Sequence, residues 1–477
     1  MLSARSVCSL KNLVMLIFIV LIVLSVNVQL FPDNFYRHDA QRLISIVLLA
    51  FVLTHSAINK FSISNLLSIS PNIRLKFFLL LAFAIASTSL SHYPRHAMIE
   101  MSIFASLCYL AMFSAGLLIE NKEEFIKRII YVVWASILLY MLAFYVGYIT
   151  ATLSKTALRW PQPNNGFTSI RLFNQYQLWS IGLITLPILA FNLKQTIKLW
   201  LTVALTCWWV ILFYSASRGV LLAWLIGMLI TAYSYKKLAW PFLRLQLTSI
   251  TTGFLVYSAL FNLLPYLLQQ DIVTGTLLRQ TVSGRTALWH VCFKIMEYHP
   301  FVGVGPLHYY WYTTIGTHPH NSLLQLGAEW GLPATFIMIS LAGKGFYCWF
   351  KKFNYNSVSI QHKLECNLTV ILFFTIITNA AYSLVDGVIV MPISQVLMFT
   401  IIGIMIGQYK YSETDEALNK ASKCKVRFRP IFAGIVLVGL VWSTMPEIIQ
   451  GLSGNPRGFT SGPNIVNTRI WVLTSRS

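Results

Sequence analysis

Residues 283–331 hold many of the side chains in this chain that can do acid–base chemistry. Five of the ten histidines fall there, namely His290, His299, His308, His318 and His320. Imidazole titrates near neutral pH and can take a proton from an attacking hydroxyl. We predict that His320 is a general base, because it stands between Pro319 and Asn321 at the entrance of an apolar, helical-looking segment. His318 and Asn321, beside it, are expected to contact the substrate.

Two arginines far apart in the sequence are candidates for binding an anion. Arg218 lies where two apolar segments are joined by almost no loop, and Arg285 lies in the first turn of a predicted helix. Guanidinium groups bind phosphate oxygens through paired hydrogen bonds, and a helix N-terminus also favours an anion. We predict that these two side chains together bind a diphosphate, and that Arg171 and Arg279 can assist in binding it. Arg218 has a second interpretation as an interfacial anchor that reaches lipid headgroups.

Acidic side chains are rare near these groups. Glu329 lies in an apolar helical segment, where a carboxylate is costly, so we expect it to orient a neighbour or pair with a buried cation within the substrate site. Asp386 is the next acidic residue expected to face the same external cavity. His308, His318 and His320 form an alternative zinc site, but no acidic or cysteine ligand accompanies them. We therefore predict no metal and no cofactor.

The chain that must position these residues is very hydrophobic. Of its 477 residues 56% are apolar and 11% are charged, and the mean hydropathy is +0.65. Because a bilayer core of about 30 Å requires about 20 mostly apolar residues per helix, we predict an all-α polytopic membrane protein with about 12–13 transmembrane helices and one large external loop. The predicted spans lie near residues 13–31, 43–58, 75–90, 99–119, 129–149, 176–191, 199–214, 220–235, 247–268, 323–341, 368–382, 393–406 and 431–445.

The formal net charge of +21 does not indicate binding to nucleic acid. Lysines and arginines gather in alternate loops, and the densest run lies at residues 420–429, after the twelfth span. Cytoplasmic loops carry such an excess for topological reasons. These loops are therefore predicted to face the cytoplasm, and the long loop between the ninth and tenth spans to face the opposite side. The seven cysteines include no CxxC pair, so no disulfide framework is predicted.

We divide the chain into four parts. Residues 1–268 are predicted to form an N-terminal transmembrane bundle, and residues 269–322 a large external loop that carries the chemistry. Residues 323–446 are predicted to form the C-terminal transmembrane helices, and residues 447–477 an external tail.

The external loop is predicted to contain one amphipathic helix, which starts at Arg285 after the N-cap Ser283. Pro300 ends this helix, and the glycines at 303 and 305 permit a tight turn. The aromatic run at residues 309–312 fits a belt at the level of the lipid headgroups, which we prefer, or a surface on which sugar rings stack.

Three motifs resemble the O-antigen ligase superfamily, whose members include lipopolysaccharide O-antigen ligases, O-antigen polymerases and bacterial protein O-oligosaccharyltransferases. The motifs are Arg218-Gly-Val-Leu-Leu222, then Gly284-Arg-Thr-Ala-Leu-Trp289 with His299-Pro-Phe-Val-Gly-Val-Gly305, and finally His320-Asn321 followed after nine residues by Gly331. The resemblance covers about residues 215–331 and is topological elsewhere. The chain departs from the family pattern at Ala334, where glycine, threonine or tyrosine is usual, and this departure weakens the choice among the branches.

The resemblance implies a metal-independent, inverting glycan transfer at the periplasmic face of a Gram-negative inner membrane. The donor it implies is a glycan on undecaprenyl diphosphate, and the acceptor is a hydroxyl group. By the same resemblance Arg218 and Arg285 bind the diphosphate, and His320 activates or orients the acceptor hydroxyl. The apolar bundle then holds the polyprenyl tail among membrane lipids, and no nucleotide sugar is required.

The acceptor differs among the branches. We rank ligation of O-antigen to lipid A–core first, because the other external loops are small and suit a lipid-borne acceptor. The predicted tail at residues 456–477 favours the branch that glycosylates pilins or other proteins, which ranks second, and polymerases rank third. A transporter or flippase would require charged residues distributed through several spans, and the predicted spans contain almost none.

Overall fold

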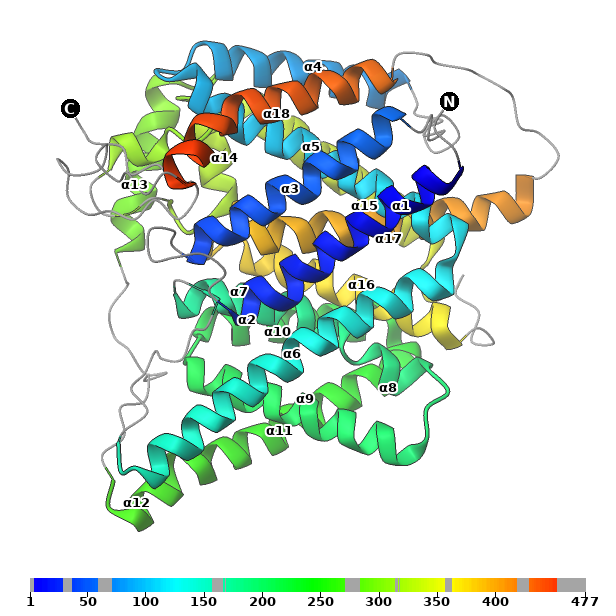
Figure 1. Ribbon diagram of the computed structural model, residues 1–477, viewed down its shortest axis with the longest axis vertical. Helices are drawn as coiled ribbons and strands as arrows, with labels where there is room; N and C mark the ends of the chain where they lie inside the picture. Colours follow the sequence, from blue (N-terminus) through cyan, green and yellow to red (C-terminus); the bar gives the residue numbers. More distant parts are fainter. Residues whose placement is uncertain are drawn as a thin grey trace.

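All the secondary structure in the part of the chain that the structure describes is helical (Figure 1). The computed structural model describes residues 4–28, 37–58, 71–156, 166–167, 169–270, 284–313, 316, 318–356, 363–417 and 429–452. The candidate Arg279, the predicted cap Ser283 and residues 453–477 of the predicted tail lie outside the described residues. The predicted all-α class is confirmed.

The helices have the following bounds. The first half of the chain forms α1 (Ala4–Ile19), η1 (Val20–Leu24), α2 (Ser25–Asn27), α3 (Arg37–Ile58), α4 (Pro71–Ser89), α5 (Pro94–Glu120), α6 (Lys122–Leu153), α7 (Ile170–Leu183), α8 (Leu186–Ala190), α9 (Gln195–Ser215) and α10 (Arg218–Tyr235). The second half forms η3 (Lys236–Leu238), α11 (Trp240–Ser258), η4 (Ala259–Leu263), α12 (Leu264–Leu268), α13 (Arg285–Tyr298), η5 (Tyr309–Tyr312), α14 (Ser322–Trp330), α15 (Leu332–Lys352), α16 (Lys363–Tyr382), α17 (Pro392–Ala417) and α18 (Arg429–Leu452).

Ten helical segments among the described residues are long and apolar enough to cross a membrane. Their existence confirms the predicted polytopic class, and each overlaps one predicted span. They are Leu10–Asn27, Ala40–Ile58, Pro71–Ser89, Pro94–Glu120, Lys122–Leu153, Gln195–Ser215, Arg218–Leu238, Trp240–Leu268, Lys363–Tyr382 and Pro392–Tyr411. A shorter apolar stretch, Ile431–Pro446, corresponds to the thirteenth predicted span, and its helix α18 continues to Leu452.

Two predicted spans are not single helices. The segment predicted at 323–341 breaks at Gly331, where α14 ends and α15 begins. Gly331 has φ +82° and ψ +162°, a conformation that is essentially restricted to glycine, and a Cβ there would overlap the carbonyl oxygen of Phe301. The segment predicted at 176–191 is likewise divided into α7 and α8. Hydropathy alone did not reveal either break, because apolar side chains continue through both.

Two π-helical turns, η1 and η4, interrupt membrane-spanning helices on either side of α6. Such turns disturb the regular hydrogen-bond ladder of a helix. In each one a carbonyl accepts a side-chain hydroxyl from α6: Ser136 donates to Ile22 O at 2.7 Å, and Tyr148 donates to Leu260 O at 2.5 Å. These bonds fix α6 to two segments that are distant in sequence.

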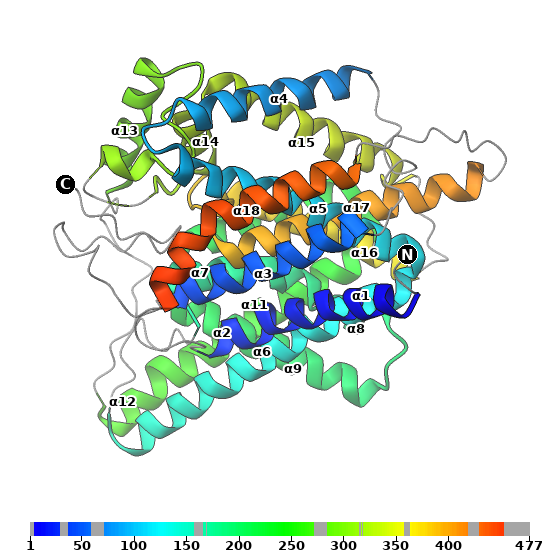
Figure 2. The same ribbon diagram turned by 45° about the horizontal axis from the view of Figure 1, so that its top comes forward.

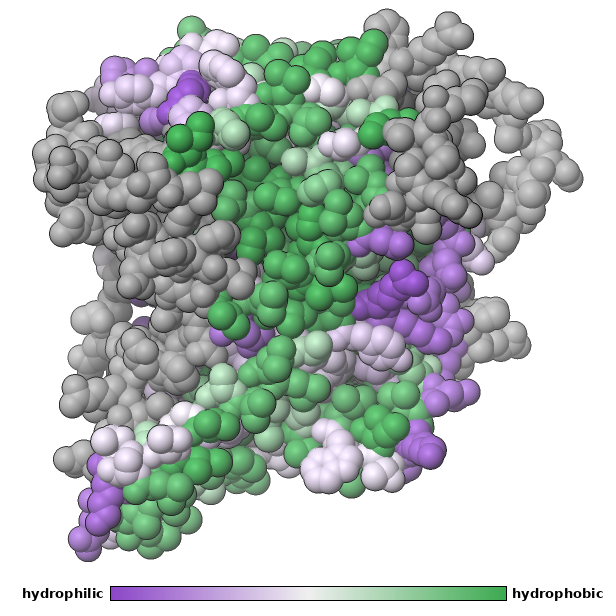
Figure 3. All heavy atoms as spheres, in the orientation of Figure 1, coloured by the Kyte–Doolittle hydropathy of each residue, from purple (hydrophilic) through white to green (hydrophobic). Residues whose placement is uncertain are grey.

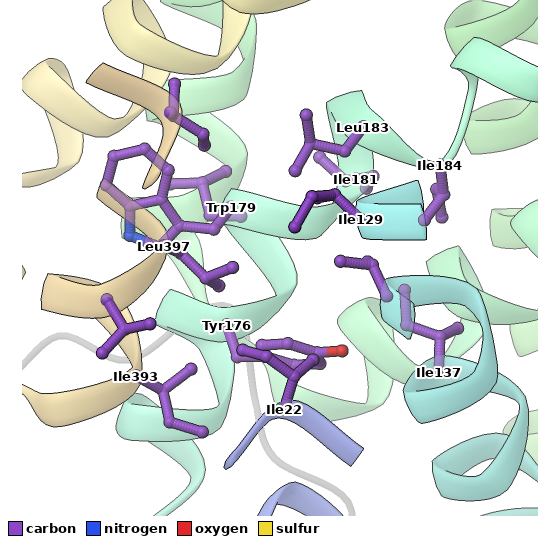
Figure 4. Packing of buried hydrophobic residues seen from close by; sticks show 14 of the residues in the cluster. Ile22, Ile129, Ile137, Tyr176, Trp179, Ile181, Leu183, Ile184, Ile393 and Leu397 are labelled. Carbon is purple, nitrogen blue, oxygen red and sulfur yellow. The ribbon is translucent and has the colours of Figure 1, made fainter. Parts of the chain in front are cut away.

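The centre of the bundle is built from paired helices. α17 packs along α5, α16 along α10, α18 along α3 and α11 along α9. Figure 4 shows Tyr176 and Trp179 of α7 in one cluster with Ile393 and Leu397 of α17, and all four side chains are at most 3% exposed. This packing holds α7 against α17, so that the segments preceding these two helices lie at the same end of the bundle.

The outer surface is largely apolar. Figure 3 shows mostly hydrophobic side chains across the middle of the described surface and hydrophilic side chains gathered toward its edges. Leu142, Leu229 and Leu255, on three membrane-spanning helices, are each 62% exposed. Such positions suit contact with lipid. Figures 1 and 2 agree in placing α13 and α14 together at one end of the bundle, where the candidate site lies.

Candidate active site around His320

His320 occupies a strained position directly before α14. Its φ is +52°, in the left-handed region, and the next residue, Asn321, caps the helix. The Asn321 Oδ1 atom accepts the backbone N–H groups of Leu323 and Leu324, each at 3.0 Å, and its Nδ2 donates to Leu384 O at 2.9 Å. Asn321, which we predicted to contact substrate, therefore also ties the helix entrance to the segment between α16 and α17.

That segment carries Asp386, which lies beside His320. The Nδ1 atom of His320 is 3.2 Å from Asp386 Oδ1, and the carboxylate is nearly fully buried. Asp386 also accepts the Gly387 N–H on Oδ1 at 2.7 Å and the Tyr382 hydroxyl on Oδ2 at 2.8 Å. The His318 ring packs against His320, with ring centroids 4.1 Å apart. The Gly387 N–H and the Tyr382 hydroxyl thus fix the position of the carboxylate that faces His320.

The buried carboxylate of Asp386 is negatively charged at neutral pH. Burial raises its pKa, but the His320 ring at 3.2 Å and the His318 ring at 3.9 Å outweigh burial and hold the pKa of Asp386 well below its usual range. A carboxylate that accepts from Nδ1 selects the imidazole tautomer in which that nitrogen carries the proton. The Nε2 atom of His320 is then left with a lone pair.

Arg171 lies on the other side of the His320 ring. Its Nη1 atom is 3.4 Å from His320 Nε2, in an exposed position. Arg171 is in the first turn of α7, where Ser169 is the N-cap and accepts the Leu172 N–H on its hydroxyl. Arg171, which we predicted to assist in binding the diphosphate, therefore lies beside His320.

Tyr382 links this cluster to Arg218 and Arg285. Its buried ring stands at the end of α16 against the first turn of α10, where a Cβ on Gly219, the residue after Arg218, would lie 3.2 Å from the ring. The charge of Arg285, the first residue of α13, also acts on the Tyr382 hydroxyl. The Arg285 Nε atom is buried and has no hydrogen-bond partner among the described residues. Two helices that begin with arginine therefore start close to the Tyr382–Asp386 pair.

Glu329 does not join this cluster. It lies near the far end of α14, about 10 Å along the helix axis from its first residue at 1.5 Å per residue. Its buried Oε1 atom accepts the Tyr309 N–H at 3.3 Å, and its carbonyl accepts the Gly305 N–H at 2.9 Å. Glu329 orients a neighbour, as one of the two interpretations expected, but the neighbour is the backbone of the long loop. Gly303 and Gly305, at φ +64° and +99°, make the predicted tight turn against it.

The long loop has a small hydrophobic cluster that is separate from the main core of the bundle. α13 begins at Arg285 as predicted, and it buries Leu288, Cys292 and Ile295 together with Tyr309. Tyr309 donates its hydroxyl to Leu288 O at 2.9 Å, so this member of the aromatic run is a core residue and belongs to neither a lipid belt nor a sugar surface. The cap of α13 is Gly284, at φ +68°.

The metal-binding alternative takes a different form from the one considered in the sequence. His308 is engaged elsewhere, because its Nε2 accepts the Tyr93 N–H at 3.0 Å and its Nδ1 lies 2.8 Å from Pro306 O. Ligand atoms of His318, His320 and Asp386 instead lie within 4.8 Å of one another, which is close enough for a shared ion. The carboxylate, however, already accepts from Tyr382 and Gly387.

Two members of the site had weak sequence signals. Asp386 was expected to face the same cavity, but nothing in the sequence paired it with His320. Tyr382 was not singled out at all. A tyrosine four residues before an aspartate, at the end of an apolar helix, is a signal that could have indicated the Tyr382–Asp386 bond.

Comparison with known families matches residues 201–339 to a family described as O-antigen ligase. The matched region runs from α9 into α15 and contains Arg218, Arg285 and His320. Arg171, Tyr382 and Asp386 fall outside it and join the site through the fold. No curated protein matches the chain.

Proposed function

From the premise that the chain carries an O-antigen ligase domain, we propose that it transfers a glycan from a polyprenyl diphosphate carrier to an acceptor hydroxyl. The coarse class, a membrane glycosyltransferase of the ligase and polymerase type, follows from the family and from the membrane-spanning helices. The observation that carries the mechanism is the contact between His320 Nδ1 and the buried Asp386 carboxylate.

In the proposed reaction His320 is the general base. Its Nε2 atom takes the proton from the acceptor hydroxyl, and the resulting imidazolium is stabilised by Asp386. The acceptor oxygen forms a bond to the anomeric carbon of the donor sugar as the bond from that carbon to the diphosphate oxygen breaks. The electron pair stays on the diphosphate leaving group. Attack from the face opposite the leaving group inverts the anomeric configuration.

Arg218 and Arg285 are the proposed ligands of the diphosphate. Each begins a helix, so backbone N–H groups and a guanidinium face the same region, and both favour an anion. The buried Nε–H group of Arg285 can donate a hydrogen bond to a phosphate oxygen. Charge that develops on the leaving group is stabilised most by donors already in place before the reaction. Arg171 donates to His320 Nε2 at 3.4 Å, and in the proposed reaction it turns to the phosphate nearest the reacting carbon, which leaves Nε2 open to the acceptor hydroxyl.

We propose that the reaction requires no metal and no cofactor. Arginine side chains supply the positive charge that a divalent ion would otherwise bring to a diphosphate. Asp386 has a different task, because its oxygens accept from His320, Tyr382 and Gly387. A hydrogen bond from imidazole to a carboxylate orients a histidine base and stabilises the imidazolium that forms.

The proposed setting is the periplasmic face of a Gram-negative inner membrane, with undecaprenyl diphosphate-linked glycan as donor and lipid A–core as acceptor. Membrane lipids surround the bundle, and nucleic acid has no part. Pilin or other protein acceptors, and chain elongation by a polymerase, are the alternatives within the family. A flippase without covalent chemistry is the alternative outside it.

The test is complementation in a host that lacks its own ligase, makes undecaprenyl-linked O-antigen and expresses a pilin reporter. Wild type, His320→Ala and the matched control His290→Ala, an exposed histidine of α13, are compared at equal membrane levels. A lipopolysaccharide ladder with wild type and His290→Ala, but not with His320→Ala, supports the ligase. A heavier pilin without a ladder supports the protein-glycosylating alternative. A ladder that persists in His320→Ala refutes the proposed mechanism.

A further inference from the structure

Arg42 is a buried arginine that the proposed mechanism does not use. It lies in the second turn of α3, and its side chain is 1% exposed. A guanidinium inside a membrane bundle is costly unless its donors are satisfied, and such residues commonly have a functional reason. The question is therefore what its hydrogen bonds hold in place.

The guanidinium group of Arg42 binds the backbone of the segment that follows Asp386. Its Nη2 donates to Val390 O at 2.7 Å, and its Nη1 donates to the Gln395 side-chain oxygen at 2.6 Å. Gln395, in the first turn of α17, donates its own amide to Ile389 O at 2.9 Å and to Glu100 Oε1 at 3.4 Å. Two adjacent carbonyls, three and four residues after Asp386, are thus bound by one buried network.

The same segment is held from the other side by α14. Ser322 N donates to Ser383 O at 2.7 Å, and the Ser322 hydroxyl donates to Asp386 O at 3.2 Å. Asp386 therefore lies between two anchors: the start of α14, next to His320, and the Arg42 network on α3. Movement at either anchor changes the position of the carboxylate relative to the imidazole.

Gln41, the residue before Arg42, holds the segment that leads to Arg171. Its amide donates to Gly166 O at 2.8 Å and to Ser25 O at 3.4 Å. Gly166 N in turn donates to Val26 O at 3.0 Å. Gly166 precedes Ser169, the N-cap of α7, by three residues, and Arg171 follows in the first turn. Two consecutive side chains of α3 therefore bind the two segments that flank the His320 ring.

We propose that Gln41 and Arg42 are positioning residues that hold Arg171 and Asp386 at His320. This inference rests on the proposed function, and neither residue touches the reacting atoms. The pair acts through backbone carbonyls of the two segments. Lysine cannot replace Arg42 in this role, because it keeps the charge but lacks the fork that reaches Val390 and Gln395 together.

The test compares Arg42→Lys with the matched control Gln408→Leu. Gln408 is also in α17 and also buried, and it bonds Trp349 and Thr369 about 20 Å along the helix from Gln395. Both purified proteins are reconstituted in liposomes, and kcat and KM for the donor are measured with the melting temperature. We expect Arg42→Lys to lose about tenfold or more in kcat with little change in KM. Gln408→Leu is expected to melt lower but to keep its kcat.

A double-mutant cycle tests whether Arg42 acts through Asp386. If it does, Arg42→Lys has little further effect in an Asp386→Asn background, because the group it positions is already lost. Losses that simply multiply in the double variant overturn the inference. So does a wild-type kcat in Arg42→Lys.

Hydrogen exchange separates failure of this inference from failure of the proposed function. Amides of residues 385–391 are expected to exchange faster in Arg42→Lys than in wild type or Gln408→Leu, whether or not any glycan is transferred. Unchanged exchange overturns the positioning role by itself. If exchange rises while the wild type transfers no glycan to any acceptor, the proposed function fails and only the structural part of the inference stands.

Discussion

Asp386→Asn is the substitution that most directly probes the proposed base. Asparagine has nearly the same shape, and its side-chain oxygen can still accept one of the hydrogen bonds that Asp386 receives. The change removes the negative charge that faces His320 Nδ1 at 3.2 Å. A hydrogen bond to a charged group contributes about 1.5–3 kcal/mol, and about 1.36 kcal/mol corresponds to a tenfold rate change. We therefore expect kcat to fall about 10- to 160-fold.

The assay is steady-state transfer by purified protein in liposomes, with a synthetic polyprenyl diphosphate glycan as donor at several concentrations. KM for the donor should change little, because Arg218 and Arg285 are intact in the variant. His320→Ala sets the inactive limit, and His290→Ala is the control for an unrelated histidine of the same loop. If Asp386→Asn transfers within about twofold of wild type while His320→Ala is inactive, the carboxylate contributes too little for the proposed role.

Four further predictions test other parts of the site and the fold. Tyr382→Phe removes one hydrogen bond to the charged Asp386 carboxylate, which contributes about 1.5–3 kcal/mol, so kcat should fall by up to about 160-fold, and an unchanged kcat contradicts the positioning of the carboxylate by Tyr382. Gly331→Ala should destabilise the protein by about 1–3 kcal/mol from its backbone conformation alone, seen as a lower melting temperature; an unchanged value refutes the strain. Because the folded-state pKa of Asp386 is depressed, its stabilising contribution is present above the unfolded value near 3.8 and is lost only as pH falls toward the folded value. Because His318 and His320 beside it gain positive charge as pH falls, the melting-temperature difference between wild type and Asp386→Asn should not shrink between about pH 7 and about pH 5, and a difference that shrinks on acidification within this window contradicts the assigned charge. EDTA should leave transfer unchanged, whereas loss of activity that a divalent cation restores would refute metal independence.

The distribution of apolar residues was enough to predict most of the fold. Long apolar stretches have few other stable arrangements than membrane-spanning helices, because every backbone polar group in lipid must be satisfied within the helix. The amphipathic helix from Arg285 followed from its own stripe of apolar residues and from Pro300. The breaks at Gly331 and between α7 and α8 were missed, since hydropathy carries no information on φ and ψ.

The candidate site was only partly predictable. Side-chain chemistry and local spacing indicated His320, Arg218 and Arg285 as candidates, and the basic loops predicted that they share one face. They could not assign Glu329 to the loop backbone, because the turn that meets it lies more than twenty residues earlier in the chain. They also left Tyr382 unnoticed, since one tyrosine in an aromatic-rich chain has no distinctive local signal.

By itself, the sequence determined the helical membrane class, the helix that begins at Arg285 and the types of side chain available for catalysis, because each depends on local composition and periodicity. Tertiary structure decided which of these side chains meet. His320 and Asp386 are 66 residues apart, and His320 and Arg171 are 149 apart. Contacts at such separations depend on how α7, α14 and α17 pack at one end of the bundle, and a pattern of neighbouring residues does not encode that packing.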